Sequence, residues 1–175
     1  KLDNNQTMYH FISGYTAKIA GTELGINEPV ATFSPCFGGP FLTLHPSKYA
    51  ELLKKKIEKF QTKIYMVNTG WVGNSANSGA KRFSLPKTRL IINSILNGDI
   101  ESSDFIYDVY FGFKIPKKLE GIESHLLDPR TAWKDFNSYK IVANKLVLKF
   151  QENYKKYDLG DKMISLGSPK ILEDL

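Results

Sequence analysis

A glycine-rich loop in the middle of the chain connects a short apolar strand to a basic strand that leads into a helix. The apolar strand is expected at Ile64–Val67, and Gly70, Gly73 and Gly79 fall in the loop that follows it. Glycine allows a backbone to turn sharply and to approach a ligand closely. The segment therefore predicts a ligand site at the edge of a sheet.

Arg82 and Thr88 follow this loop and are predicted to frame the ligand. A planar guanidinium can stack on a base or bind phosphate through two hydrogen bonds, and a threonine at a helix N-terminus adds a hydroxyl to unpaired backbone N–H donors. A nucleotide suits this combination. From these two residues alone, however, a surface cation and a plain helix cap are the commoner explanation.

Helix and strand patterns alternate along the chain. Alternating apolar residues predict a strand or bent hairpin at Ile106–Pro116. Such a mixture predicts an α/β domain with a mixed sheet flanked by helices. The expected helices are Met8–Ala20, Pro46–Phe60, Pro86–Asn97 and one from Asn137 or Ser138 to Tyr154, whose core face would contain Ile141, Val142, Leu146 and Phe150.

Length and composition fit one soluble domain of 175 residues, 42% of them hydrophobic. No apolar stretch approaches the roughly 20 residues that span a bilayer, and the polar start Lys1–Thr7 lacks the apolar centre of a signal peptide. The single cysteine, Cys36, cannot form an internal disulfide, which agrees with a reducing compartment. We expect a cytoplasmic protein without a membrane partner.

The net charge of +6 raises the question of a polyanionic partner. Much of the excess is scattered lysine, as at Lys54–Lys56 on the polar face of an expected helix, so a solvated surface is the simplest explanation. Attraction of an anionic small substrate comes next. A nucleic-acid-binding module would interleave aromatic residues with a cationic stripe, whereas the aromatic residues here fall largely on expected core faces. We expect no nucleic-acid partner.

Several residue patterns of self-sufficient catalysis are missing from the sequence. It has no G-x-x-x-x-G-K-[ST] phosphate loop and no Gly-x-Ser-x-Gly motif. His10, His45 and His125 lack the spacing of a zinc helix, and Cys36 has no base near it in sequence. We therefore assign no catalytic and no metal-binding residue, and the chain is typical of half an active site.

Several sequence blocks, taken in order, resemble the ATP-dependent phosphoenolpyruvate carboxykinases. The similarity extends over nearly the whole chain but covers only the C-terminal third of that family's polypeptide. The resemblance therefore implies that residues 1–175 are a single partial domain, the C-terminal part of the nucleotide-binding domain. The blocks are Met8–Lys18, Ala20–Glu23, Glu28–Pro29, Thr32–Gly38, Phe41–Pro46, Val67–Trp71, Lys81–Arg89 and Leu127–Pro129.

The resemblance implies that the intact enzyme converts oxaloacetate and ATP to phosphoenolpyruvate, ADP and carbon dioxide in gluconeogenesis. It also implies Mg²⁺ with the nucleotide and Mn²⁺ at a second site. The family's phosphate loop, metal ligands and oxaloacetate-binding arginines would all precede Lys1. The missing N-terminal part of the same protein would be the partner of this chain. A noncatalytic structural or interaction domain derived from the enzyme remains the alternative.

Three residues of the nucleotide site carry over from the resemblance. Arg82 matches the arginine that lies against the adenine, Phe83 occupies the adjoining nucleotide-contacting position, and Thr88 matches the threonine beside the base. The sequence departs from the family at Ala80, where glycine is usual, and at Phe83, where an aliphatic residue is typical. Adenine contact could therefore be retained with altered affinity.

A mobile lid is the remaining implication of the resemblance, and it would lie near residues 14–35. The stretch Thr22–Pro40 contains glycines and prolines without a sustained period and is expected to be a long loop. A lid that closes excludes water, which would protect an enolate intermediate from protonation and ATP from hydrolysis.

Overall fold

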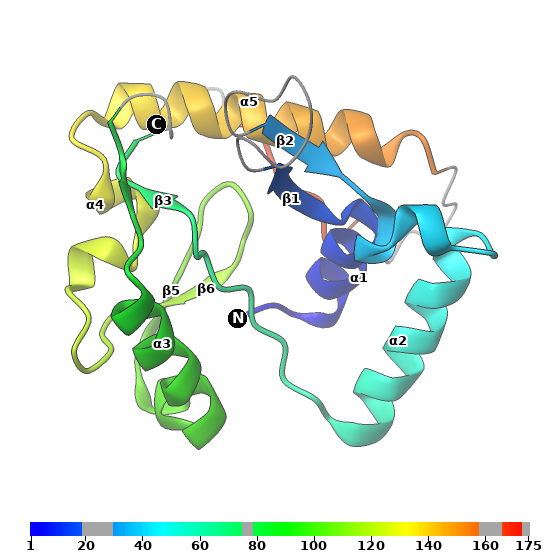
Figure 1. The fold of residues 1–175 in the computed structure, drawn as a ribbon, viewed down its shortest axis with the longest axis horizontal. Coiled ribbons are helices and arrows are strands. Elements are labelled where there is room, and N and C mark those ends of the chain that lie inside the picture. The colour runs from blue at the N-terminus through cyan, green and yellow to red at the C-terminus, as the bar shows by residue number, and fades with distance from the viewer. Residues whose placement is uncertain (19–29, 75–78, 158–165, 173–175) are drawn as a thin grey trace.

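The computed structural model describes residues 1–18, 30–74, 79–157 and 166–172 (Figure 1). Helices and short strands alternate, and the strands pair as three separate two-stranded antiparallel sheets, β1–β2, β3–β4 and β5–β6. The helices are α1 Asn4–Ser13, α2 Pro46–Phe60, α3 Leu85–Asn97, α4 Pro129–Ala132 and α5 Phe136–Tyr154. The strands are β1 Tyr15–Lys18, β2 Val30–Phe33, β3 Trp71–Val72, β4 Lys81–Arg82, β5 Phe105–Tyr107 and β6 Lys114–Pro116. Single 3-10 turns lie at η1 Pro35–Phe37, η2 Gly39–Phe41, η4 Asp99–Ser102 and η5 Ser124–Leu126.

Helix α5 runs along one edge of the molecule and joins its two halves (Figure 1). On one side lie α1, α2 and the β1–β2 hairpin, and on the other lie α3, α4 and the β5–β6 hairpin. No helix among the described residues is both long and apolar enough to cross a bilayer.

The described residues do not form the expected mixed sheet flanked by helices. The segment Ile64–Val67, predicted as a buried strand, makes only an isolated antiparallel bridge, in which the Leu2 N–H donates to the Ile64 carbonyl at 2.9 Å. Met66 is 45% exposed. A strand needs hydrogen-bonding neighbours on its edges, and the described part of the chain supplies no strand that pairs with this segment. The coarser prediction, an α/β arrangement of helices and strands, is confirmed.

Helix α1 begins and ends earlier than predicted. Asp3 and Gln6 form a reciprocal capping box at its start, and the helix ends at Gly14, whose φ of 55° is left-handed. A Cβ at Gly14 would overlap the Ser34 carbonyl oxygen, to which the chain comes very close at this point. The predicted helix at Met8–Ala20 is therefore wrong for residues 14–18, because only glycine fits this turn into β1, and its last two residues lie outside the described part of the chain.

The expected long loop Thr22–Pro40 is in part outside the described residues. Its described part is not a loop throughout, because β2 pairs with β1 in the register Tyr15↔Phe33 to Lys18↔Val30. Two 3-10 turns follow, η1 and η2. The glycines and prolines correctly predicted that the described part of this segment contains no α-helix, but they did not indicate the short strand β2.

The predicted helices α2, α3 and α5 are confirmed, and α2 has the predicted bounds. The buried face of α5 is only partly as predicted, because Ile141 is 56% exposed and Val142 is 41% exposed. The face that is buried consists of Tyr139, Ala143, Val147 and Phe150.

Phe150 lies at the centre of the largest core cluster. Its ring is within 6.4 Å, centroid to centroid, of the rings of Tyr9, His10, Tyr15, Phe33 and Phe111. These rings come from α1, the β1–β2 hairpin and the β5–β6 turn. Much of the aromatic content is therefore explained by core packing, as the sequence predicts.

Candidate functional site

A cavity of about 680 Å³ lies between the glycine-rich loop and the segment that enters α5. One wall comes from β3, β4 and the first turn of α3, and the other from residues 123–138. Its volume is in the range of small-molecule sites. The lining residues of the first wall are Val72, Gly73, Asn74, Gly79, Ala80, Lys81, Arg82, Phe83, Ser84 and Lys87, and those of the second are Glu123, His125, Leu126, Ala132, Trp133, Lys134, Asp135 and Ser138.

Arg82 lines this cavity and is held by the β3–β4 pairing, in which it stands opposite Trp71. Its guanidinium carbon lies 5.9 Å from the centroid of the Trp71 ring, and its Nε donates a long hydrogen bond of 3.5 Å to the Thr69 carbonyl. The side chain is otherwise exposed. A flat cation on an aromatic support is thus available to a ligand with a π-face or a negative charge.

Phe83 lines the same wall and is half-buried. Its N–H donates to the Gly70 carbonyl at 2.7 Å, which ties the residue to the start of the glycine-rich loop. The loop therefore brings the two ends of the motif together.

Thr88 is the predicted site residue that does not line the cavity. It is 8% exposed in the first turn of α3, where its N–H donates to the Ser84 carbonyl at 2.9 Å. The structure thus brings two of the three predicted residues to the cavity and places the third inside the helix start.

The second wall was not predicted from the sequence, because it lies about 40 to 50 positions further along the chain. Asp135 caps α5 by accepting hydrogen bonds from the N–H groups of Asn137 and Ser138 at 3.2 and 2.9 Å. The hydrogen bond from the Ser138 side chain is the main cause that lowers the pKa of Asp135. An Asp directly before an apolar helical pattern is a recognisable cap signal, and Asp135 could have located the start of α5.

The cavity carries more positive than negative charge. Four cationic side chains line it, Lys81, Arg82, Lys87 and Lys134, against the carboxylates of Glu123 and Asp135. This excess favours an anionic ligand.

The two walls touch at one end of the cavity. Gly73 has a φ of 81°, and a Cβ added to it would lie 2.6 Å from the Ala132 carbonyl oxygen. Glycine is therefore required there twice, for its left-handed backbone and for this close approach.

Asp108, Asp128 and Arg130 form a polar cluster beside the second wall of the cavity. Arg130 binds the Asp128 carboxylate through two nitrogens, with Nε 3.0 Å from Oδ1 and Nη2 2.7 Å from Oδ2. Asp108 lies near them and accepts hydrogen bonds from the N–H groups of Tyr110 and Phe111 at 3.0 and 2.6 Å. Burial raises the pKa of Asp108. This cluster joins the β5–β6 turn to α4 and so fixes the approach to α5.

Metal binding finds no support in the described part of the chain, where no group of three His, Cys, Asp or Glu side chains could hold an ion. Burial also raises the pKa of the Cys36 thiol to about 11, so little thiolate forms at neutral pH.

Comparisons with known proteins show the family of this chain. The family profile described as phosphoenolpyruvate carboxykinase, in its ATP-dependent form, matches residues 1–125. Proteins named phosphoenolpyruvate carboxykinase (ATP) from Leptospira biflexa and Campylobacter jejuni subsp. doylei are each 52% identical, over 93% and 90% of this chain. The one from Oceanobacillus iheyensis is 48% identical over 97%. The chain spans 30 to 32% of the length of these relatives. It belongs to the ATP-dependent phosphoenolpyruvate carboxykinase family.

Proposed function

We propose that this chain is part of an enzyme that converts oxaloacetate and ATP to phosphoenolpyruvate, ADP and carbon dioxide, and that its cavity holds the adenine side of ATP. The observation that carries the proposal is the placement of Arg82 and Phe83 together on one wall of a cation-rich cavity. The relatives that cover nearly the whole chain are named for this activity.

Arg82 and Phe83 bind the base in this proposal. The guanidinium stacks on the adenine, which contributes about 0.5 to 2 kcal/mol, and the Phe83 ring packs beside it. Thr88 is the third proposed residue of the site, and because its side chain is buried in the first turn of α3 and does not line the cavity, it would hold the helix start beside the base. These residues position ATP and take no part in bond making.

The phosphates, the divalent metals and oxaloacetate are bound by the rest of the polypeptide. The proposed metals are Mg²⁺ with the nucleotide and Mn²⁺ at a second site, and the proposed location is the cytoplasm. This division follows from the length of the relatives, of which the chain spans less than a third. It also explains why the described residues hold no metal-ligand cluster of their own.

The rest of the polypeptide also completes the fold. Ile64–Val67 has the sequence of a buried strand but only an isolated bridge, so a neighbouring strand from outside this chain would complete a mixed sheet there. Leu85, Ile92 and Leu96 form an apolar stripe on α3, with spacings of seven and four residues, and are 72%, 41% and 77% exposed. A covering element would bury this stripe.

A lid near residues 14–35 closes over the site in this proposal. Residues 19–29 lie outside the described part, but the β1–β2 pairing holds the two ends of the segment together. In the intact enzyme, the double variant Gly21→Ala/Gly25→Ala should lower turnover and leave ATP affinity nearly unchanged. An unchanged turnover in this double variant would contradict the proposed lid.

Arg82→Ala in the intact enzyme tests the proposed site. The KM for ATP should rise about tenfold, since 1.4 kcal/mol corresponds to a factor of ten. Arg89→Ala is the matched control, because Arg89 is exposed on the same helix start and does not line the cavity. An unchanged KM for ATP in Arg82→Ala would refute the site, and an intact protein without carboxykinase activity would favour a noncatalytic descendant.

A further inference from the structure

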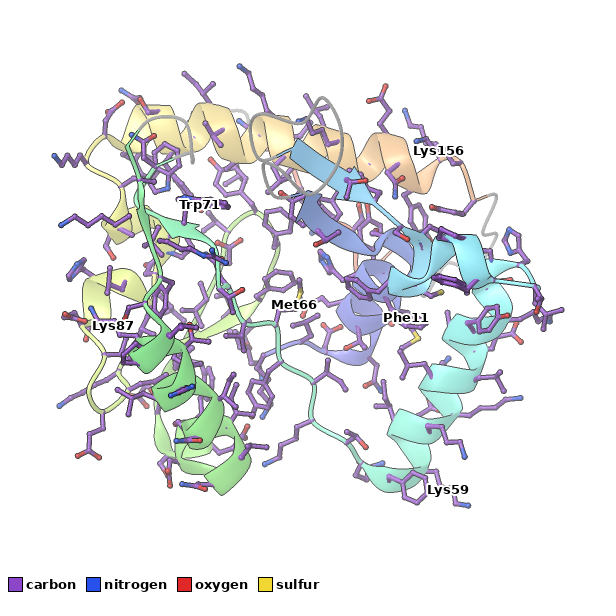
Figure 2. The ribbon with its side chains drawn as sticks, in the orientation of Figure 1. Phe11, Lys59, Met66, Trp71, Lys87 and Lys156 are labelled. Carbon is purple, nitrogen blue, oxygen red and sulfur yellow. The ribbon has the colours of Figure 1, made fainter. Side chains whose placement is uncertain are left out.

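An ion pair links the two walls of the cavity. Lys87 Nζ lies 2.6 Å from Glu123 Oε2, and both side chains line the cavity. The side chains are 30% and 53% exposed. Lys87 belongs to the first turn of α3, which follows Arg82 and Phe83 directly, and Figure 2 shows it at the edge of the molecule beside this helix start.

The position of Lys87 is unfavourable for the helix itself. Ser84 is the N-cap of α3, so Lys87 is the third helical residue, where a glutamate would complete a capping box. A cation in the first turn also opposes the helix dipole, and this turn contains no acidic residue. Helix stability therefore does not explain this lysine.

Holding the two walls together does not explain the pair either. Ile91 and Ile95 of α3 already pack against the buried side chains of Leu119 and Ile122. Exposed ion pairs add little to the stability of such a contact. The pair is therefore better explained by its place in the cavity.

The carboxylate of Glu123 is the group that needs a partner there. The hydrogen bond from Lys87 is the main cause that lowers the pKa of Glu123, so this side chain is ionised at neutral pH. The other carboxylate in the lining, Asp135, is engaged as the cap of α5. An unpaired carboxylate covered by a bound nucleotide would lose water and repel the phosphates.

We infer that Lys87 is a positioning residue for ATP that acts through Glu123, by neutralising its carboxylate at the edge of the cavity. Lys87 need not touch the nucleotide. This inference rests on the proposed function, because it requires the nucleotide to occupy this cavity.

Three variants of the intact enzyme test the inference, namely Lys87→Met, Glu123→Gln and the double variant. Lys87→Met should raise the KM for ATP about tenfold and leave kcat within about twofold, because the unpaired Glu123 carboxylate weakens the binding of ATP and takes no part in the chemical step. Glu123→Gln should stay within about twofold of the parent, and adding it to Lys87→Met should restore the KM. The Lys87→Met defect should also shrink as salt is raised, through screening.

The control is a second ion pair of the same kind far from the cavity. Lys48 Nζ lies 3.3 Å from Glu51 Oε2 on α2, and Lys48→Met and Glu51→Gln should change neither constant. Thermal unfolding of every variant shows whether it is folded, and Lys87→Gln replaces Lys87→Met if that variant is not.

Two outcomes would overturn the inference. A double variant as defective as Lys87→Met would mean that Lys87 binds ATP directly, and a Glu123→Gln defect equal to that of Lys87→Met would mean that the pair is a structural brace. Arg82→Ala, measured in parallel, separates the two proposals. A raised KM in Arg82→Ala with an unchanged KM in Lys87→Met refutes only the role of Lys87, whereas an unchanged KM in Arg82→Ala refutes the site.

Discussion

Acidification should destabilise this chain through one buried histidine, His10. Its side chain is among the least accessible in the core, at 4% exposed, and neither ring nitrogen has a hydrogen-bond partner among the described residues. The rings of Phe113 and Phe150 lie 4.9 and 5.1 Å away, centroid to centroid. An apolar aromatic environment of this kind disfavours the imidazolium, and burial lowers the pKa of His10 from 6.5 to about 4.

The sign of the pH dependence follows from these two pKa values. Between pH 6.5 and 4 the unfolded chain binds a proton at His10 that the folded chain does not, so the free energy of unfolding falls as the pH falls. Each pKa unit corresponds to about 1.36 kcal/mol, so the full loss is about 3 kcal/mol by pH 4. Above pH 6.5 this residue should have no effect.

Urea unfolding of the chain and of His10→Leu at several pH values measures this loss. The difference in free energy of unfolding between the two proteins should change by about 3 kcal/mol from pH 7 to pH 4. Taking the difference removes the contribution of Asp108, whose raised pKa acts in the opposite direction. Met8→Leu is the control, because Met8 lies in the same core cluster, is 3% exposed and carries no titratable group. A parent and a His10→Leu variant with the same pH dependence would refute the reasoning.

Three substitutions test other contacts. Gly14→Ala should abolish cooperative unfolding in circular dichroism, because its Cβ would overlap the Ser34 carbonyl oxygen; a normal transition would show that the turn can relax. Gly73→Ala should weaken binding of an ATP analogue to the intact enzyme and lower its Tm, because its Cβ would lie 2.6 Å from the Ala132 carbonyl oxygen and the left-handed backbone disfavours alanine. Unchanged affinity would contradict the importance of that contact. Arg130→Met should lower the free energy of unfolding in urea by about 1.5 kcal/mol, because Asp128 loses the guanidinium but keeps the hydrogen bond from the N–H of residue 130, and a loss below about 0.5 kcal/mol would count against the polar cluster.

Local chemistry was enough to predict the helices that carry clear caps and periodicity. Pro46 begins α2 and Gly98, with a φ of 83°, ends α3, and both are signals that act within a few residues. Alternation of apolar residues predicted a strand or a bent hairpin at Ile106–Pro116, and the structure has the hairpin, in which β5 pairs with β6.

The errors arise where distant parts of the chain decide the structure. The helix expected at Met8–Ala20 is cut short because the backbone of Ser34 approaches Gly14, which no local pattern reveals. The strand at Ile64–Val67 has a strand-like sequence but lacks neighbours in the described residues. Ile141 is exposed although it is apolar, because in a helix with many apolar residues the packing partners determine which face is buried.

The candidate site likewise has one part that could be predicted from local sequence and one part that depends on tertiary packing. Arg82 was predicted because the glycine-rich loop precedes it directly, whereas Phe83 was implied only by the family resemblance. The hydrogen bond from the Phe83 N–H to the Gly70 carbonyl ties Phe83 to the start of that loop. The second wall, with Glu123 and Asp135, depends on the tertiary packing that brings residues 123–138 against the start of α3. A sequence pattern could locate its helix cap but not its neighbours.

Photoaffinity labelling of the intact enzyme with 2-azido-ATP tests most directly whether this cavity holds the base of ATP. After digestion and mass spectrometry, the account predicts that the label is found in the peptides that contain residues 79–88 and 123–138, and that excess ATP prevents the labelling. Labelling that ATP prevents but that lies wholly outside these two segments would contradict the proposed site.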